Sequence, residues 1–339
     1  MLTPRQNLIE TIKGGNPDRF VKQFEFFTYA PDPLSRQYPF PVKGGPDTVD
    51  GWGVTDRWPE GVVASFPVHD DEHKVVKDIK KWRDVVRHPN LDLPEEAWVS
   101  AIEADKQANR DEMFFATGVF PGVFETLHYL MGMTDALINF VEEPEEMHAL
   151  IDYISDYLCK YSDMIASHIK PDMLMFSDDL GSSRNSFISP GMFEEFLLPA
   201  YKKVFGRYRE NGCELIYLHN DSYSANLVPQ MIEAGIDIWQ GCVTNNNVPE
   251  LVKKYCGQIS FMGDIDNSLV DKADWTKELV EREVRRACEN NGKFYFIPCM
   301  TMAISPGVYP GVFEYISECI DKMSEELTSN GSWQSLQTK

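Results

Sequence analysis

Three residues of types that commonly bind metal ions stand at the ends of two strand-like segments. Leu215–His219 is apolar up to its histidine and precedes Asp221, while the run 294–300 contains Cys299 in a corresponding position. Residues two apart on an extended chain point to the same side, so His219 and Asp221 can converge. Imidazole, carboxylate and thiolate groups are zinc ligands, and the pattern predicts a zinc site at His219, Asp221 and Cys299. The alternative is that His219 and Asp221 hydrogen-bond to loop backbone and that Cys299 is an inert core residue.

Two adjacent carboxylates, Asp178 and Asp179, end another strand-like segment, 172–179. A carboxylic acid there could donate a proton to a leaving oxygen or hydrogen-bond a substrate. Alternatively, one of the two could cap the following turn. Asp264 and Asp266 end a later segment and are weaker candidates, because aspartate is common in turns.

Aromatic side chains are concentrated near the N-terminus, at Phe24, Phe26, Phe27 and Tyr29. They could line a flat apolar substrate pocket, to which Met300, beside Cys299, could add a further apolar group. The alternative, that they belong to the ordinary core of the protein, is equally open.

The elements that must position these residues alternate along the chain. Seven strand-like segments are expected, at 20–28, 113–118, 172–179, 215–219, 237–242, 259–266 and 294–300. From residue 132 onward they are separated by amphipathic helical patterns, which indicates βαβ units and a parallel sheet. No glycine fingerprint for nucleotide binding follows any strand, so a Rossmann domain is disfavoured. The prediction is one distorted (β/α)8 TIM barrel over residues 1–339, with its site at the carboxyl ends of the strands.

Local signals refine this architecture. Thr3 and Pro4 predict a helix start, Pro144 divides a long helical pattern in two, and Ser189-Pro190 begins another helix. The N-terminal extension includes a long ordered loop around Asp50-Gly-Trp-Gly53. The eighth strand is either missing or lies in the N-terminal third, and residues 329–339 are expected to form a loose tail.

The composition excludes several classes of function. With 32 basic and 53 acidic residues the net charge is −21, which disfavours nucleic acid as a partner. No apolar run reaches the roughly 18 residues that a membrane span needs, and no secretion signal is evident at the N-terminus. The seven cysteines form no Cys-x-x-Cys pair, which is typical of a reducing compartment. We therefore expect a cytoplasmic protein.

A set of short motifs, in order along nearly the whole chain, resembles the uroporphyrinogen decarboxylase superfamily. The motifs are Pro17-Asp18-Arg19, Trp52-Gly53, Gly132-Met-Thr-Asp135, Glu143-Pro144-Glu145, Asp178-Asp179-Leu-Gly181, Ile188-Ser-Pro190, His219-Asn-Asp221 and Gly263-Asp-Ile-Asp266. The resemblance implies one distorted (β/α)8 barrel. It also implies one of two chemistries, tetrapyrrole decarboxylation or corrinoid-dependent methyl transfer.

The decarboxylases of the superfamily hold their substrate with an arginine-rich N-terminal motif. The corresponding stretch here, 20–27, is acidic and aromatic and has no arginine. In the methyltransferase branch, zinc is held by His-x-Cys at one strand end and by a cysteine on a later strand. This chain matches that pattern at His219 and Cys299 but has Asp221 where the first cysteine is expected.

The resemblance therefore favours a corrinoid-protein-dependent methyltransferase. A carboxylate in place of a thiolate leaves zinc a stronger Lewis acid, which suits cleavage of an ether. We expect demethylation of a small methylated substrate, a methoxyarene, with transfer of the methyl group to a corrinoid carried by a partner protein. Transfer from a methylated corrinoid protein to a thiol or other acceptor is the first alternative. A decarboxylase of the uroporphyrinogen type, acting on a smaller acid, is the second, and a non-enzymatic binding protein is the last.

Overall fold

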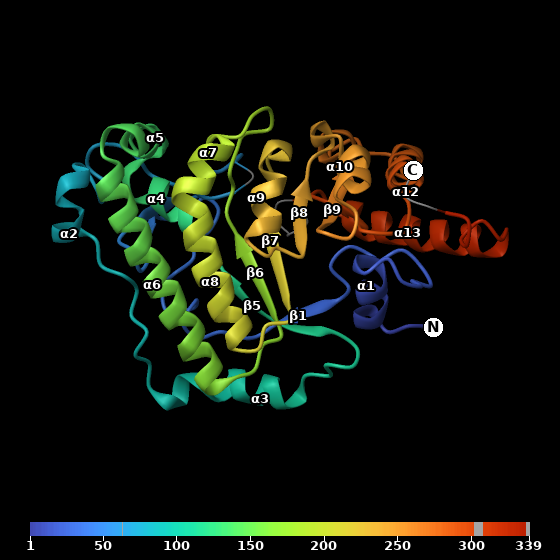
Figure 1. Cartoon of the computed structure of the whole chain (residues 1–339), viewed down its shortest axis with the longest axis horizontal. Helices are drawn as coiled ribbons and strands as arrows, with labels where there is room; N and C mark the ends of the chain where they lie inside the picture. The colour runs from blue at the N-terminus through green and yellow to red at the C-terminus, as the bar shows by residue number, and fades with distance from the viewer. Residues whose placement is uncertain (63, 302–307, 337–339) are drawn as a thin grey trace.

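The computed structural model describes residues 1–62, 64–301 and 308–336, and its centre is one curled sheet of seven parallel strands (Figure 1). The strands follow one another across the sheet in chain order. They are β1 (Phe27–Tyr29), β5 (Phe114–Val119), β6 (Met173–Ser177), β7 (Leu215–His219), β8 (Ile238–Cys242), β9 (Ser260–Ile265) and β10 (Phe296–Met300). All seven correspond to expected segments, and the expected α/β barrel class is confirmed.

Helices surround this sheet, most of them on its outer face, while the N-terminal helix contributes Leu8 to the core on its inner face. The α-helices are α1 (Pro4–Ile12), α2 (Trp82–Val85), α3 (Val99–Gln107), α4 (Val123–Met131), α5 (Met133–Glu142), α6 (Pro144–His168), α7 (Pro190–Met192), α8 (Leu198–Glu210), α9 (Val228–Glu233), α10 (Val248–Tyr255), α11 (Asn267–Val270), α12 (Lys277–Asn291) and α13 (Val312–Ser329). Short 3-10 segments are η1 (Ile79–Lys81), η2 (Glu95–Trp98), η4 (Ala225–Leu227) and η5 (Thr244–Asn246), and η3 (Phe193–Leu197) is a π-helical turn before α8.

The expected helix starts are observed. Thr3 caps α1 in a capping box with Gln6, and Pro144 occupies the first turn of α6. The Ser189 hydroxyl accepts a hydrogen bond from the Met192 N–H at the start of α7. These signals are local, so they could be read without knowledge of the fold.

Alternation along the strands separates two apolar cores. One set of side chains faces the helices, and includes Leu174, Phe176, Ile216 and Leu218. The other set fills the interior of the curled sheet, and consists of Leu8, Val21, Phe26, Phe114, Ala116, Met173, Met175, Leu215, Tyr217, Ile238, Met262, Ile297 and Cys299. Because successive strand residues point to opposite faces, the sheet has a helix-facing side and an inner side.

Within the described residues the sheet has seven strands, and its two edge strands, β1 and β10, do not pair with each other. The eighth strand of a regular barrel is missing at this position from the described part of the chain. The buried side chain of Gln23 lies at this seam. Its amide nitrogen donates to the Phe313 carbonyl and the Ser317 hydroxyl at 3.1 and 2.8 Å, and its oxygen accepts from the Met300 N–H at 3.4 Å. Side-chain hydrogen bonds thus connect the two edges where a strand ladder would close a regular barrel.

The first strand is shorter than expected. Only 27–29 pair with β5; of the other residues predicted as strand, 20–22 are irregular and 23–26 form a turn. Gln23 has a φ of 46°, which is outside the strand region. The backbone N–H groups of Phe20 and Lys22 are taken by the side chains of Ser324 and Glu25, at 3.1 and 3.0 Å, and so are not available to a ladder.

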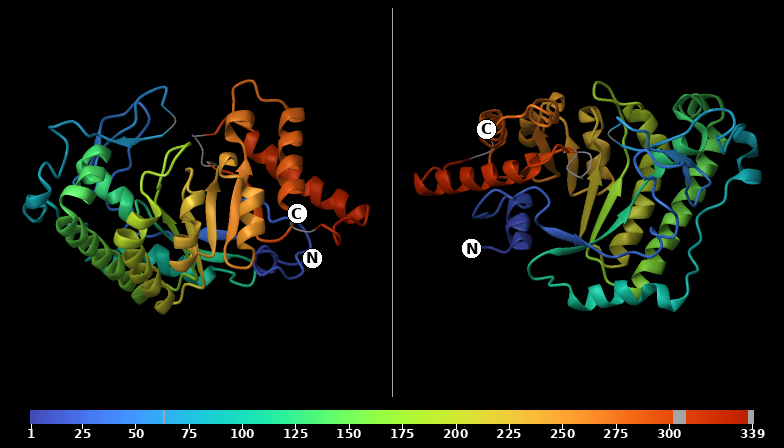
Figure 2. Two further views of the ribbon diagram at one scale, coloured as in Figure 1. Left: turned by 45° about the horizontal axis from the view of Figure 1, so that its top comes forward. Right: turned by 180° about the vertical axis from the view of Figure 1, so that it is seen from behind.

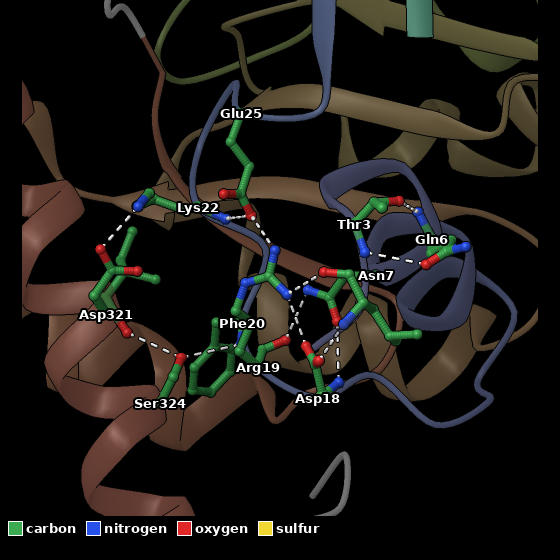
Figure 3. Close-up of polar contacts among 12 residues, drawn as sticks. Thr3, Gln6, Asn7, Asp18, Arg19, Phe20, Lys22, Glu25, Asp321 and Ser324 are labelled. Atoms are coloured by element: carbon green, nitrogen blue, oxygen red, sulfur yellow. Dashed lines mark hydrogen bonds and ion pairs between the residues drawn. The ribbon is translucent and has the colours of Figure 1, made fainter. Parts of the chain in front are cut away.

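The segment Pro17-Asp18-Arg19 connects the two ends of the chain through hydrogen bonds. Figure 3 shows the Asn7 side chain donating to the Arg19 carbonyl and accepting from the Asp18 N–H, at 3.1 and 3.0 Å. Arg19 pairs with Asp18 at 2.7 Å, and the bond between Phe20 and Ser324 follows directly. As a result α1 and α13, from opposite ends of the chain, lie beside one another (Figures 1 and 2).

The long N-terminal loop is ordered, as expected, and contains a small antiparallel sheet. Its strands are β2 (Thr48–Val49), β3 (Thr55–Arg57) and β4 (Phe66–Pro67). The Asp50 carboxylate accepts from the N–H groups of Trp52 and Val54 at 2.9 and 2.8 Å, and this holds the Asp50-Gly-Trp-Gly53 turn. Among the described helices, none is long and apolar enough to cross a lipid bilayer.

The expectation of a loose tail from residue 329 is wrong for its described part. Ser329 ends α13, and Trp333 is buried beside Phe20, with ring centroids 5.1 Å apart. The Trp333 indole N–H donates to the Pro17 carbonyl at 2.8 Å. A single buried aromatic residue anchors an otherwise polar segment, and composition alone did not reveal it. Residues 337–339 lie outside the described part.

Candidate metal centre

Three side chains of metal-ligand type meet at the carboxyl ends of two neighbouring strands. Asp179 follows β6, His219 ends β7, and Asp221 lies two residues further on. One ligand atom from each lies within 4.8 Å of the others. Ser177 pairs with His219 across the ladder, and alternation then brings Asp179 and His219 to the inner side of the sheet. The predicted convergence of His219 and Asp221 is observed, and Asp179 joins them.

The turn between His219 and Asp221 is held by the residue between them. The Asn220 side chain is fully buried, accepts from the Leu180 N–H at 3.3 Å and donates to the Ser224 hydroxyl at 3.0 Å. The Asn220 carbonyl accepts the Trp239 indole N–H at 2.8 Å. Because Asn220 points away from the barrel interior, its two neighbours point inward.

A glycine on β8 allows this turn to lie close to the sheet. Gly241 has a φ of 95°, and a Cβ there would stand 2.7 Å from the Asn220 carbonyl oxygen and 2.8 Å from the Asp221 Cα. The ladder register shifts between Gln240 and Cys242 at this point. Any other residue would force the backbone of Asp221 away from β8.

The His219 ring is oriented by Gln240, a fully buried residue of β8 that lies directly opposite it in the ladder. The Gln240 amide nitrogen donates to the carbonyls of Met300 and Thr301, at 3.3 and 2.9 Å. Its oxygen is therefore the atom that faces His219 Nδ1, which must be the donor. The lone pair on Nε2 is then available to a ligand.

The site concentrates negative charge. Burial, and then the neighbouring charge of Asp221, raise the pKa of Asp179 to about 6, although His219 and the Asp221 N–H, which donates to Asp179 at 2.9 Å, oppose the shift. Within the described residues, no lysine or arginine is among the main groups that shift the pKa of Asp179 or of its acidic neighbour Glu125. A divalent cation is the natural partner of such a group, and one imidazole with two carboxylates is a donor set that zinc accepts.

Asp178 has a structural position. It is fully buried on the helix side of β6 and accepts from the N–H groups of Phe124 and Glu125, at 2.9 and 2.7 Å, and from the Tyr201 hydroxyl at 2.7 Å. Burial raises the pKa of Asp178 to about 7 against the effect of these donors. Asp178 thus caps a turn, but the turn is the first of α4, which precedes β6 in the chain, and not the turn that follows Asp179. Neither of its oxygens faces the barrel interior.

Glu125 is a candidate that the sequence did not single out. The anchoring of α4 by Asp178 brings the buried Glu125 carboxyl to the end of β6, where the Ser177 hydroxyl donates to it at 3.3 Å. Burial, and then the charges of Asp179 and Asp178, raise the pKa of Glu125 well above its usual range. An acidic residue in the largely apolar first turns of a helix that directly follows a strand was the available signal.

Cys299, the third ligand expected from the sequence, is not in the group of three. It is fully buried in the inner core, and its thiol donates to the Met300 carbonyl at 2.9 Å. Burial raises the pKa of the Cys299 thiol well above its usual range. Asp179 occupies the third position because β6 is adjacent to β7, whereas β10 is three strands away in the sheet.

The candidate substrate-binding residues divide between core and mouth. Phe26 is fully buried in the inner core, and Phe24 packs against it. Met300 faces the helices and is fully buried in the outer core, so its side chain is not part of the barrel interior. Tyr29 is 45% exposed at the end of β1, and its hydroxyl contacts the Met175 sulfur on β6.

Phe120, which the sequence did not single out, extends the aromatic surface at the mouth. It is 56% exposed just beyond β5, and its ring centroid lies 6.5 Å from that of Tyr29. The two rings stand at the ends of adjacent strands, next to the strands that carry Asp179 and His219. An aromatic pair at the carboxyl ends of these strands is suited to contact a flat apolar ligand.

The weaker pair of carboxylates has structural partners. Asp264 is buried and forms an ion pair with Arg286 at 3.1 Å on α12, while Asp266 caps α11 by accepting from the Ser268 N–H at 2.8 Å. Asp264 has a φ of 58°, and the irregular backbone after Gly263 turns its side chain toward the helices. Both residues have the structural role that the sequence left open.

Comparison with known proteins gives three findings. Residues 57–323 match the family described as Uroporphyrinogen decarboxylase (URO-D). A methylated-thiol–coenzyme M methyltransferase from Methanosarcina mazei is 32% identical over 129 residues, which cover 37% of this chain and 31% of that protein. The chain therefore matches less than a third of the length of this curated relative. A methyltransferase structure from Methanosarcina mazei superposes over 95% of this chain and 99% of its own, with a TM-score of 0.62 and 13% identity, which shows a shared fold.

Proposed function

Because this chain belongs to the uroporphyrinogen decarboxylase family, we propose that it is a methyltransferase that removes a methyl group from a methoxylated aromatic compound and transfers it to the Co(I) of a corrinoid protein. The observation that carries the proposal is the cluster of Asp179, His219 and Asp221 at the carboxyl ends of the barrel strands. The name of the Methanosarcina mazei relative supports the methyltransferase branch.

Asp179, His219 and Asp221 would hold zinc, and two carboxylates with one imidazole would leave it electrophilic enough to polarise an ether oxygen. The proposed ligand set differs from the one that the sequence suggested, since Asp179 takes the place of Cys299. A thiolate ligand at Cys299 would require its side chain to leave the inner core. Cobalt(II) substitution distinguishes the two sets, because only a thiolate ligand gives an intense near-ultraviolet charge-transfer band.

Residues around the cluster fit the remaining parts of the reaction. Tyr29 and Phe120 would hold the aromatic ring of the substrate at the mouth. In the transfer the methyl–oxygen bond breaks with its electron pair remaining on oxygen, and the electron pair of Co(I) forms the new bond to the methyl carbon. The phenolate that leaves has a conjugate acid with a pKa of about 10, so a nearby proton donor lowers the barrier. Glu125 is the carboxyl group best placed for this, since Asp178 is committed to α4.

Decarboxylation of a tetrapyrrole is not favoured by this site. Lys22, the one basic residue between 20 and 27, pairs with Asp321 at 2.8 Å on α13. Phe26 from the same stretch lies in the inner core. No cationic side chain of this stretch is therefore free to hold the carboxylates of uroporphyrinogen, and we expect no decarboxylation of that compound.

The second candidate function is transfer of methyl from a methylated corrinoid protein to a thiol. It is favoured by the name of the relative, which acts on methylated thiols and coenzyme M. A thiol acceptor needs activation as a thiolate, for which a thiolate-rich metal site is better suited than the carboxylates of Asp179 and Asp221. The donor set thus ranks this candidate second.

The test compares the two directions in one preparation. Zinc-loaded protein is mixed with cob(I)alamin and a series of methoxybenzenes, and the phenol and methylcobalamin formed are measured. In parallel it is mixed with methylcobalamin and a small thiol, and the thioether is measured. Phenol and methylcobalamin in equal amounts, lost in His219→Ala, support ether demethylation. Thioether formation without phenol would replace the proposal with the second candidate, and uroporphyrinogen serves as the control substrate.

A further inference from the structure

The side chain of Gln240, on β8, forms hydrogen bonds with groups at the ends of two other strands, β7 and β10. Its side chain is fully buried and lies on the inner side of β8, between the end of β7 and the end of β10. One end of its amide faces His219 Nδ1, and the other donates to the carbonyls of Met300 and Thr301. One contact is with a member of the candidate metal centre, His219, and the other two are with backbone carbonyls at the end of β10.

The two carbonyls determine the orientation of this amide. A carbonyl can only accept, so the Gln240 NH2 group must face Met300 and Thr301, and its oxygen must face the imidazole. An amide oxygen can only accept as well, so His219 carries its proton on Nδ1. The backbone of β10 thereby fixes, through Gln240, which nitrogen of His219 has a free lone pair.

We propose that Gln240 is a positioning residue that holds His219 as the Nδ1–H tautomer with Nε2 directed toward a metal ion. The inference rests on the proposed function only in taking His219 as a ligand. Partners of this kind raise ligand basicity and remove the entropy of ring rotation before metal binding, and their loss typically weakens metal affinity about 10- to 100-fold. Gln240 would not touch the substrate.

Two substitutions separate the bond to His219 from the bonds to β10. Gln240→Leu removes all of them. Gln240→Glu keeps an acceptor for the Nδ1–H but removes the amide donor to the Met300 and Thr301 carbonyls. We expect Gln240→Leu to lower zinc affinity about 10- to 100-fold. We expect Gln240→Glu to bind zinc at least as tightly as the wild type and to unfold at a lower temperature than the wild type does.

Gln23→Leu is the matched control. Gln23 is also a fully buried amide that bonds to the end of β10, through the Met300 N–H, but it does not contact His219. An effect that arises only from loosening β10 should appear in Gln23→Leu and in Gln240→Glu. An effect that arises from His219 should appear in Gln240→Leu alone.

The experiment is a competition titration of metal-free protein with zinc and a chromophoric chelator, together with nitrogen-15 NMR of the His219 ring. The wild type and Gln240→Glu should show a protonated Nδ1, and Gln240→Leu should show a mixture of tautomers. Equal zinc affinity in wild type and Gln240→Leu, or loss of affinity in Gln23→Leu to the same degree, would overturn the proposal. Zinc binding without methyl transfer in the wild type would instead count against the proposed function and leave this inference standing.

Discussion

The substitution Asp179→Asn should have opposite effects on zinc binding and on the stability of the metal-free protein. Asparagine keeps the size of the side chain and an oxygen that can accept from the Asp221 N–H, which lies 2.9 Å from the Asp179 carboxylate. It removes one negative charge from a group of three side chains whose ligand atoms lie within 4.8 Å of one another. Zinc should therefore lose a ligand, while the metal-free site should lose a repulsion.

The expected changes in zinc affinity and in stability can be calculated from the number of ligands and from the pKa of Asp179. Structural zinc sites with four ligands bind with roughly 10–16 kcal/mol, so one ligand contributes about 3 kcal/mol, or about a hundredfold in affinity. In the metal-free protein, the pKa of Asp179 is raised from 3.8 to about 6. A carboxyl with a raised pKa destabilises the fold increasingly as pH rises through that interval and by a constant amount above it. That amount is ~1–3 kcal/mol, since the group is partly exposed at the barrel mouth.

The assay is urea unfolding at pH 8, with a chelator and with excess zinc. We expect metal-free Asp179→Asn to be more stable than metal-free wild type by ~1–3 kcal/mol, and zinc to add less stability to it than to the wild type. Cys299→Ser is the matched control and should keep wild-type zinc affinity. If Cys299→Ser lost affinity about a hundredfold and Asp179→Asn changed neither quantity, the ligand set would be His219, Asp221 and Cys299, and the reasoning from the cluster would be refuted.

Three further predictions concern Asp178, His128 on α4, and Phe120 at the mouth. Asp178→Ala should lower the free energy of unfolding by ~3–5 kcal/mol in urea, because three buried donors lose their acceptor; zinc content in the folded fraction should not change, and its loss at unchanged stability would indicate a direct role in the site. His128→Phe should flatten the pH dependence of unfolding between pH 6.5 and 4. Burial lowers the pKa of His128 to about 4, so the unfolded state takes up a proton first and wild-type stability falls by up to ~3 kcal/mol as pH decreases through that window; parallel curves for the two proteins would contradict this. Phe120→Ala should raise KM for methoxybenzenes about fivefold with a smaller effect on kcat, since a stacking contact contributes ~1 kcal/mol; an unchanged KM in steady-state kinetics would remove Phe120 from the substrate site.

The acidic surroundings of the centre explain why substitution of Asp179 and substitution of Cys299 should affect the metal-free protein differently. Asp179 and Glu125 lie together with raised pKa values, and within the described residues no lysine or arginine is among the main groups that act on them. Such an arrangement destabilises the metal-free fold, as is common where function requires charge in a buried position. Cys299, in contrast, is a small apolar group in a packed core and is compatible with the fold without any ligand.

The sequence by itself determined the features that depend on local geometry. The period of two along Leu215–His219 placed His219 and Asp221 on one side, and the alternation of strands and helices indicated a barrel with its site at the strand ends. Helix starts at Pro4 and Pro144 were predicted correctly for the same reason, because capping depends on residues within one turn. The same period could also have separated Asp178 from Asp179, since adjacent residues of a strand face opposite sides.

The tertiary structure alone decided which groups from different strands meet. Asp179 and Cys299 are both inward-facing residues at strand ends, and nothing in their local sequence ranks one above the other as the third ligand. The strand order makes Asp179 the third member of the group, because β6 pairs with β7 whereas β10 lies three strands away. Gln240 and Glu125 were missed for the same reason: each reaches the centre across a strand or helix boundary. Contacts of this kind are set by strand order, register and curl, which arise from packing between segments far apart in the chain.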